Sequence, residues 1–285
     1  MIKLNRIIDP TTFPSDFTGV KRVELELNLL KQKRELRRGA IEKFDFDPKK
    51  WKKTKNILKL ESYGKCAYCE SNFTTVAYGD VEHFRPKSKY WWLAYCYHNY
   101  AASCQLCNQK YKGSKFPVAK NSFKAPRVRR NNTDRYLNTV AGTFSVDPID
   151  STQGISLSAY ITKHIDERPD ALDPYIDDPT DFIKYSANER LKEVLIIPKD
   201  DGQAKLVRSC VKLFGLNRKE LRVMRYKKLL LLSNLKRMIP HLLDDNHKKA
   251  LKKTIDRLFL NPSNQYSGMC NYFNSLPLSK LPTLI

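Results

Sequence analysis

The sequence predicts a mainly helical α+β protein in which a small zinc-stabilised module, with a short strand and a short helix, is set into a helical body. Long stretches near both ends of the chain have helical periodicity. Two Cys-x-x-Cys pairs, Cys66/Cys69 and Cys104/Cys107, lie on either side of a short strand-like stretch, VEHF. The stretch CQLCNQKYKG, which contains the second pair, has the pattern of a short helix.

The chain divides into a helical segment at 1–62, a cysteine-rich module at 63–118 and a mostly helical region at 119–285. In the first segment, residues 20–39 place apolar side chains on one helical stripe and end in a glycine. A second short helix is expected from Pro48 to Leu60.

In the third segment, residues 119–180 are rich in Asn, Asp, Thr and Pro and predict irregular structure. The stretches FIKYSAN and RLKEVLIIP predict a hairpin. Helices are expected near 202–214, 218–240 and 244–259, with Asn217 as N-cap of the second. The C-terminal tail has little structural signal.

The composition favours a polyanionic partner. Lys and Arg number 52 against 30 Asp and Glu, a net charge of +22. Such a surplus favours nucleic acid over a merely soluble basic surface, because each neutralised phosphate also releases a counterion. No stretch reaches the ~18 uninterrupted apolar residues that a membrane span needs, and we expect no membrane partner. Seven cysteines without a signal peptide predict a reducing, cytoplasmic location.

The four paired cysteines, Cys66, Cys69, Cys104 and Cys107, predict a structural Zn²⁺ site. Zinc takes four tetrahedral ligands, and a Cys-x-x-Cys turn lets two thiolates converge from one backbone bend. A redox-active or merely buried pair is the alternative. The other cysteines lack metal spacing and are expected to be buried and unreactive.

Glu82 and His83 have the chemistry of a hydrolytic centre. Metal-assisted phosphodiester cleavage needs a base for water and a cation for the leaving oxygen. Adjacent residues on a strand point to different sides, so Glu82 can bind a metal while His83 acts as the base. A lone histidine would more often be structural.

Two asparagines complete the predicted centre. Asn108 directly follows a zinc cysteine, and its amide oxygen is a plausible second ligand, with Glu82, for a catalytic Mg²⁺ or Mn²⁺. Asn99 is the candidate to orient His83 by a hydrogen bond. An asparagine taken alone is usually a turn or cap residue.

Basic residues near these positions are candidates for nucleic-acid binding. Lys112 lies four residues after Asn108 on the same predicted helix face, where it could contact a phosphate. Arg85, Lys87 and Lys89 alternate after the predicted base and could line the nucleic-acid path. A solvated basic strand edge is an equally good interpretation of each of these three.

With these residues, the segment resembles the HNH (ββα-metal) endonucleases, which have a treble-clef-like fold. The resemblance implies that His83 is the general base, Glu82 and Asn108 bind the catalytic metal, and Asn99 orients the base. Asn at the last position is a common variant that preserves metal binding. The four-cysteine zinc site also occurs in many members.

A more specific resemblance is to the HNH subunit of Septu and retron-associated anti-phage systems. It rests on CAYCE, VEHFRPK, SCxxCN and KGSKFP, with DPYIDDP and LNRKEL further on. This implies a DNA-cutting enzyme that acts in a complex with an ATPase subunit. Two alternatives stay open: an HNH nuclease that cuts RNA such as tRNA, and a non-catalytic zinc-dependent nucleic-acid adaptor.

Overall fold

Most of the described chain is helical, and two small sheets lie between the helices. The computed structural model describes residues 1–9, 13–120, 123–149 and 154–283. In this part of the chain the α-helices are α1 (Gly19–Arg38), α2 (Pro48–Lys52), α3 (Lys55–Glu61), α4 (Asp134–Thr143), α5 (Leu157–Glu167), α6 (Ala204–Phe214), α7 (Lys219–Met238), α8 (Asp245–Ile255) and α9 (Ser267–Asn274). The segments Leu106–Lys112 and Asp256–Leu260 are π-helical.

Both sheets are antiparallel pairs of strands. In the first, β1 (Asp80–His83) pairs with β2 (Tyr100–Ser103), and His83 lies opposite Tyr100. In the second, β3 (Ile183–Asn188) pairs with β4 (Glu193–Pro198), as the predicted hairpin requires. Strands β1 and β2 lie between the two cysteine pairs, and the helical segment Leu106–Lys112 begins within the second pair and continues beyond it.

Strand β1 begins at Asp80, directly after a glycine. The preceding Gly79 has φ +65°, and a Cβ atom at this position would lie 2.2 Å from the ring of Phe73. Only glycine fits here without displacing that ring, so Gly79 directs the chain from the cysteine turn into β1.

Several predicted helices are confirmed. Helix α1 occupies the predicted range and ends at Gly39, whose left-handed backbone (φ 77°) lets its N–H bond to Glu35 O and Leu36 O. Helices α6, α7 and α8 lie at the three predicted C-terminal positions. Cys96, Cys210 and Cys270 are buried, as predicted.

Two predictions of local structure were wrong. The expected single helix at 48–60 is broken into α2 and α3, and at the break the N–H groups of Lys53 and Thr54 bond three residues back, to Lys50 O (3.3 Å) and Trp51 O (3.0 Å). The stretch 119–180 is not merely irregular, since it contains α4 and α5. Their N-caps, Thr133 and Ser156, each accept a backbone N–H three residues on.

Asn217 does not cap α7, contrary to our prediction; the N-cap position is occupied by Arg218. The Asn217 side chain instead reaches strand β4, where it accepts from Ile196 N–H and donates to Ile196 O, both at 2.8 Å. Asn217 therefore connects the start of α7 to the second sheet.

The C-terminal tail also has structure that the sequence did not indicate, because it contains helix α9, which buries Cys270 and Phe273.

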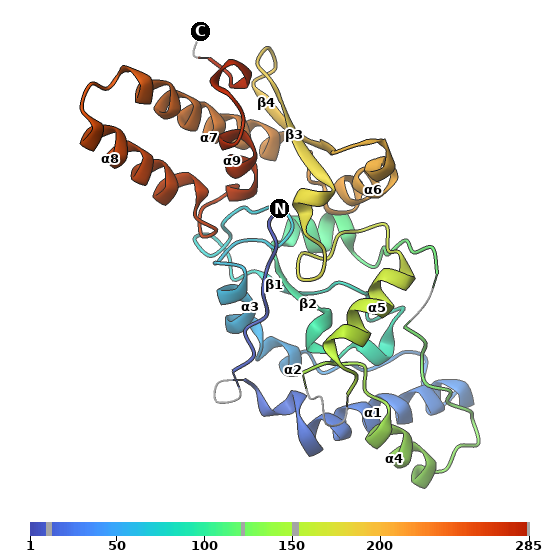
Figure 1. Ribbon diagram of the computed structural model, residues 1–285. Coiled ribbons are helices and arrows are strands. Elements are labelled where there is room, and N and C mark those ends of the chain that lie inside the picture. Colours follow the sequence, from blue (N-terminus) through green and yellow to red (C-terminus); the bar gives the residue numbers. More distant parts are fainter. Residues whose placement is uncertain (10–12, 121–122, 150–153, 284–285) are drawn as a thin grey trace.

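The first sheet lies near the middle of the molecule, with α1 and α4 at one end and α7 and α8 at the other (Figure 1). The buried apolar cluster includes Met1, Cys66 and Leu281, so it draws on all three predicted segments. No helix within the described ranges combines the length and the apolar character needed to span a bilayer.

Candidate metal centre and active site

The first cysteine pair lies on a tight turn that is fastened to the sheet. Cys66 N–H donates to Ser71 O (3.0 Å), and Glu70, with a left-handed φ of 60°, donates its N–H to Cys66 O (2.9 Å). Ala67 N–H donates to Ala102 O (2.9 Å) on β2. These bonds hold the turn against the strand that leads to the second pair.

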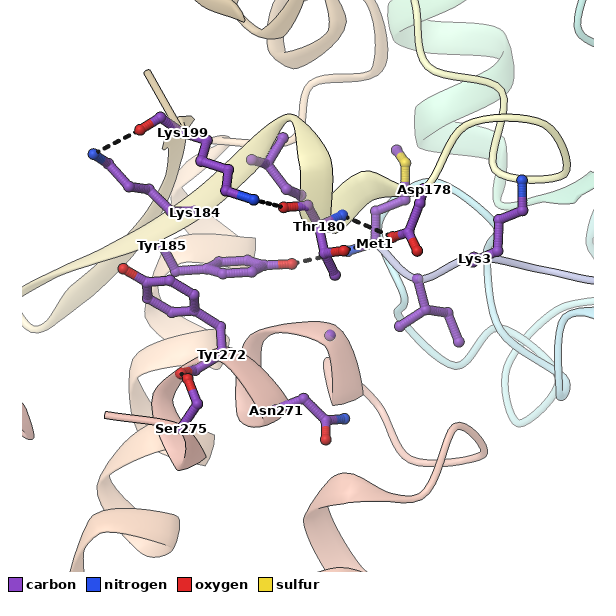
Figure 2. A pocket seen from close by; sticks show the side chains of 13 residues that line it. Met1, Lys3, Asp178, Thr180, Lys184, Tyr185, Lys199, Asn271, Tyr272 and Ser275 are labelled. Carbon is purple, nitrogen blue, oxygen red and sulfur yellow. Dashed lines mark hydrogen bonds between the residues drawn. The ribbon is translucent and has the colours of Figure 1, made fainter. Parts of the chain in front are cut away.

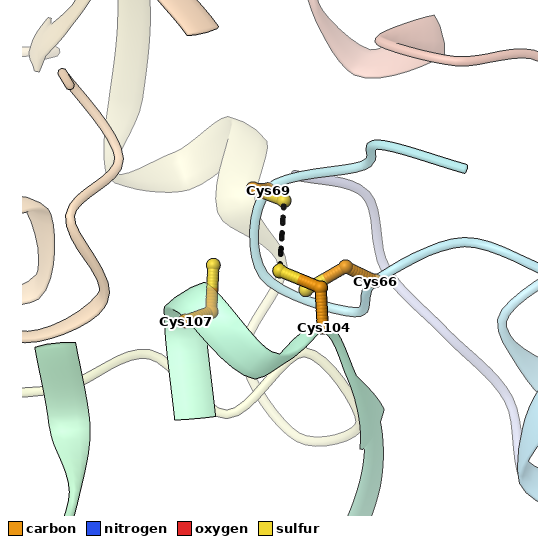
Figure 3. A group of neighbouring side chains, drawn as sticks. All are labelled: Cys66, Cys69, Cys104 and Cys107. Carbon is orange, nitrogen blue, oxygen red and sulfur yellow. Dashed lines mark hydrogen bonds between the residues drawn. The ribbon is translucent and has the colours of Figure 1, made fainter. Parts of the chain in front are cut away.

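The four predicted cysteines come together. Their sulfur atoms all lie within 4.8 Å of one another, and Cys69 Sγ is 3.9 Å from Cys104 Sγ (Figure 3). A tetrahedral zinc ion with Zn–S bonds of ~2.3 Å separates its sulfurs by roughly 3.8 Å. The cluster can therefore hold a metal ion such as zinc.

Arg218 contacts this cluster, and the sequence analysis gave it no role. Its guanidinium donates to Cys107 Sγ (3.6 Å) and Cys69 Sγ (3.7 Å), one sulfur from each pair. The pKa of the Cys69 thiol is lowered, chiefly by hydrogen bonds from neighbouring cysteines and further by the Arg218 charge. The LNRKEL stretch contains Arg218, but nothing in its spacing relates it to the cysteines.

The same module contains a pocket of about 410 Å³, which is lined by residues of β1, by residues that follow β1 and by the segment after Cys107. Three of the predicted catalytic residues, Glu82, His83 and Asn108, line it together with Lys87. Asn99, the fourth predicted residue, does not line it and is 0% exposed. The structure thus brings together the predicted base and both predicted metal ligands.

His83 is held by a backbone carbonyl. Its Nε2 lies 3.0 Å from Ala94 O, which also accepts the hydroxyl of Tyr100 (2.7 Å). Because a carbonyl only accepts, Nε2 carries the proton and Nδ1 is left as the basic nitrogen. The Trp51 ring packs edge-on against the imidazole, with 5.0 Å between centroids.

The imidazole of His83 is neutral. Burial lowers its pKa to about 3, and the positive charges of Lys87 and Lys112 act in the same direction. A neutral imidazole is the form that can accept a proton from water.

Glu82 is buried beside a lysine. An ion pair joins Lys112 Nζ to Glu82 Oε1, and the same ammonium donates to His83 O (2.9 Å). Burial raises the pKa of Glu82 and lowers that of Lys112, so each charge depends on the other. Lys112 is 1% exposed, so the structure does not place its ammonium where we predicted a phosphate contact.

Asn108 is held by a carboxylate that the sequence analysis did not assign. Its Nδ2 donates to Asp80 Oδ2 (3.1 Å), and Gln109 Nε2 donates to the same oxygen (2.9 Å). Asp80 and Glu82 are two residues apart on β1 and share one face of the strand. That period-two spacing of carboxylates is the signal that could have identified Asp80.

Asn99 does not make the predicted hydrogen bond to His83. Its Oδ1 accepts from Arg85 N–H (2.8 Å), and its Nδ2 donates to Arg85 O (2.9 Å) and Leu93 O (3.4 Å). Leu93 precedes the residue whose carbonyl holds His83. Asn99 therefore fixes the backbone at Arg85, two residues after His83, and at Leu93, next to Ala94. It does not hold the imidazole ring itself.

Arg85 is buried, which corrects its predicted place on a nucleic-acid path. The side chain is 0% exposed and donates to Glu167 Oε2 (2.7 Å), with further bonds to Tyr160 (3.3 Å) and His164 (3.1 Å). Glu167 also accepts the hydroxyl of Tyr90 (2.7 Å). This network joins the end of β1 to α5.

The two remaining candidates for nucleic-acid binding, Lys87 and Lys89, lie at different pockets. Lys87 is half-buried and lines the pocket, with its ammonium 5.4 Å from the Trp51 ring centroid. Lys89 is exposed and lies at a different hollow, beside Lys115 and Lys212. Only Lys87 is therefore placed to act at the pocket.

A further pocket, of about 530 Å³, lies between the N-terminal segment, β3 and α9 (Figure 2). Its lysines donate to backbone carbonyls: Lys199 Nζ to Thr180 O (2.9 Å) and Lys184 Nζ to Lys199 O (3.0 Å). None of the predicted site residues lines it.

Fold and site together define a mainly helical protein with a four-cysteine cluster that could hold a metal ion, and a pocket that contains Glu82, His83 and Asn108. The chain is 26% identical to Septu protein PtuB of Bacillus mycoides (strain KBAB4) over an alignment of 322 residues, which covers 100% of this chain and 93% of that protein. This similarity supports a Septu-like protein, the resemblance that the motifs had indicated. No family model matches the chain, and no solved structure gives a significant match.

Proposed function

We propose that this chain is the nuclease subunit of a Septu-like anti-phage defence complex, a metal-dependent HNH endonuclease that hydrolyses phosphodiester bonds of DNA. Whole-length similarity to Septu protein PtuB supports the role in defence. The observation that carries the enzymatic proposal is the pocket that gathers His83, Glu82 and Asn108. A zinc-dependent adaptor would need only the cysteines and a basic surface.

His83 acts as the general base. The bond to Ala94 O occupies its Nε2–H, so Nδ1 takes the proton from the attacking water. Burial keeps the ring neutral, and the lowered pKa also makes it a weaker base than a free imidazole. A positioned base of this kind contributes roughly 100- to 10,000-fold to a hydrolytic rate.

Glu82 and Asn108 would hold the catalytic Mg²⁺ or Mn²⁺. Glu82 Oε1 is a buried oxygen paired with the Lys112 ammonium, and Asn108 directs its Nδ2 to Asp80, which leaves the amide oxygen for a cation. Carboxylate and amide oxygens suit a hard ion. When bound, the ion would stabilise negative charge on the phosphate and leaving oxygen. Lys112 is paired with Glu82, so its ammonium would compete with a bound cation for that carboxylate.

The first test of the enzymatic role is a cleavage assay on purified full-length protein. The wild type and His83→Ala are incubated with plasmid DNA and with total RNA, in Mg²⁺ or Mn²⁺, with and without the ATPase partner. We expect the wild type to cut DNA and His83→Ala to lose at least about 100-fold of that rate. A variant at the exposed His247, His247→Ala, is the matched control and should keep full activity.

Zinc content and circular dichroism must match between His83→Ala and the wild type, so that a folding defect is not read as lost chemistry. If the two proteins behave identically on every substrate, the enzymatic proposal fails. Cleavage of RNA alone would keep the reaction and replace the substrate. Activity only when the ATPase is present would support the proposed complex.

A further inference from the structure

Helices α2 and α3 lie alongside strand β1 and run in the opposite direction. Trp51 on α2 packs on His83 at the end of β1, and Lys55 on α3 is close enough to Asp80, at the start of β1, for their charges to interact. The N-terminal helices, to which the motifs gave no role, therefore form one wall beside the pocket.

Three lysines on this wall, Lys52, Lys55 and Lys59, form what we call the lysine ridge. Lys52 is exposed and the other two are half-exposed, and within the described ranges none is ion-paired to a carboxylate. Their neighbours differ: Lys50 and Lys53 are both paired with Asp16, at 3.0 and 2.6 Å. Asp16 thus partly offsets the charges of Lys50 and Lys53, while the three ridge lysines have no such ion pair.

The three ridge charges act on one another. Burial lowers the pKa of Lys55, and the charges of Lys59 and Lys52 lower it further, while Asp80 opposes them only in part. Three like charges with only the charge of Asp80 opposing them favour an anionic partner, which relieves their repulsion. The repeat of negative charge in a phosphodiester backbone suits a row of lysines.

An exposed aromatic ring lies beside Lys55, the middle lysine of the ridge. Tyr78 is 84% exposed, and Lys55 Nζ lies 5.7 Å from its ring centroid. An exposed ring beside a cation is the combination with which proteins stack an unpaired base while holding the adjoining phosphate. Packing does not account for the position of Tyr78, since most of the ring is in solvent.

We propose that the lysine ridge and Tyr78 bind a nucleic-acid strand by its phosphodiester backbone, with one base on Tyr78, and lead it to the pocket that contains His83. The proposal rests on the proposed function, because it makes the ridge the entry track of that site. Helix α8 has exposed lysines of its own, Lys249, Lys252 and Lys253, but it contacts neither β1 nor the pocket.

The test compares two triple variants of equal charge. Lys52→Ala/Lys55→Ala/Lys59→Ala removes the ridge, and Lys249→Ala/Lys252→Ala/Lys253→Ala removes the same charge from α8. Binding to fluorescent DNA and RNA oligonucleotides of one sequence, single-stranded and duplex, is measured over a range of salt. Both triples are made in full-length His83→Ala without divalent cations, so that binding is scored apart from cleavage.

We expect the ridge variant to bind roughly 100-fold more weakly at 0.15 M salt, with a salt slope shallower by about 3, and the α8 variant to change little. Equal losses in the two variants would overturn the ridge and leave the proposed function standing. Absence of any cleavage by the wild type would overturn the proposed function while the binding difference remained. Loss of the ATPase partner alone, with nucleic-acid affinity kept, would also overturn the ridge.

Tyr78 gives a second, milder readout. Tyr78→Ala should weaken single-stranded binding about fivefold or more and affect duplex less, because only an unpaired base can stack. Tyr78→Phe keeps the ring and should bind as the parent does. If Tyr78→Ala binds single strands as tightly as Tyr78→Phe, the base-stacking part of the proposal is overturned. The DNA and RNA arms show which source of phosphodiester the track accepts.

Discussion

The cysteine cluster and the His83 pocket lie in the same module but are held together differently. The cluster consists of four identical donor atoms within 4.8 Å of one another, and three of its four residues are buried. The pocket contains unlike groups: an imidazole, a carboxylate and an amide, open to solvent on one side. Each of those groups is held by a different partner, namely Ala94 O, Lys112 and Asp80.

The two centres are therefore stabilised by different interactions. A four-thiolate site is stabilised by the ion it binds, since the free thiolates would repel one another. The pocket depends on a buried polar network that extends through Asn99 and Arg85 to α5. Loss of metal should therefore disrupt the cluster first, and loss of a network residue should disrupt the pocket first. The following changes test that division.

The largest effect is expected from removing the second cysteine pair. Cys104→Ser/Cys107→Ser should lose the bound zinc, about one ion per chain, and unfold the module, because the binding energy of a structural zinc is folding energy. Zinc is measured by atomic emission and unfolding by thermal melting. Cys270→Ala, a buried cysteine outside the cluster, is the control and should retain the metal. Full zinc content in the double variant would contradict the assignment.

Next comes the buried network. Arg85→Met should destabilise the protein by about 3–5 kcal/mol, because it leaves the carboxylate of Glu167 buried without its partner. Urea unfolding measures this loss. Arg85→Met/Glu167→Leu removes both charges and should be more stable than Arg85→Met alone. Zinc content should stay the same in both, since neither residue contacts the cluster; loss of zinc would show that the two centres are not independent.

Arg218 should have a moderate effect confined to the cluster. Arg218→Ala removes N–H donors from two sulfurs and should weaken zinc binding about 10- to 100-fold, as other partners of metal ligands do. Competition with a chromogenic chelator measures this affinity. Arg222→Ala, one turn further along α7 and paired with Glu193, is the matched control and should bind zinc normally. Equal affinities in the two variants would leave Arg218 without this role.

The smallest effect, taken over a single pH unit, is expected from the protonation of His83. Its pKa is about 3 in the folded protein, below the ~6.5 of an unfolded chain. Between these values the unfolded state binds a proton that the folded state does not, so stability falls as pH falls. The loss approaches about 1.4 kcal/mol per pH unit. Urea unfolding of His83→Phe in magnesium-free buffer should give a shallower pH slope than the wild type. Parallel slopes would show that this ring does not titrate as described.

Whether the residues of a centre could be predicted from the sequence depends on how far apart along the chain the interacting residues lie. The cysteine spacing is local, and one backbone bend is enough to converge two sulfurs, so Cys66, Cys69, Cys104 and Cys107 were all found. The partners of Asn99, Lys112 and Arg85 are not local: they come from Arg85 backbone, Glu82 and Glu167. A basic residue near a predicted base could not be distinguished by sequence from one buried behind it.

What the sequence alone determined here is chemistry of short range: the paired cysteines, the Glu82–His83 dipeptide on a strand and the glycine that ends α1. Residue spacing along a strand or turn limits which side chains can converge, and no distant contact is needed. Only the tertiary structure determined which hydrogen-bond or ion-pair partner each buried polar group has. Buried charges and amides must find partners wherever packing provides them, and for Arg218 that place was a pair of sulfurs more than a hundred residues away.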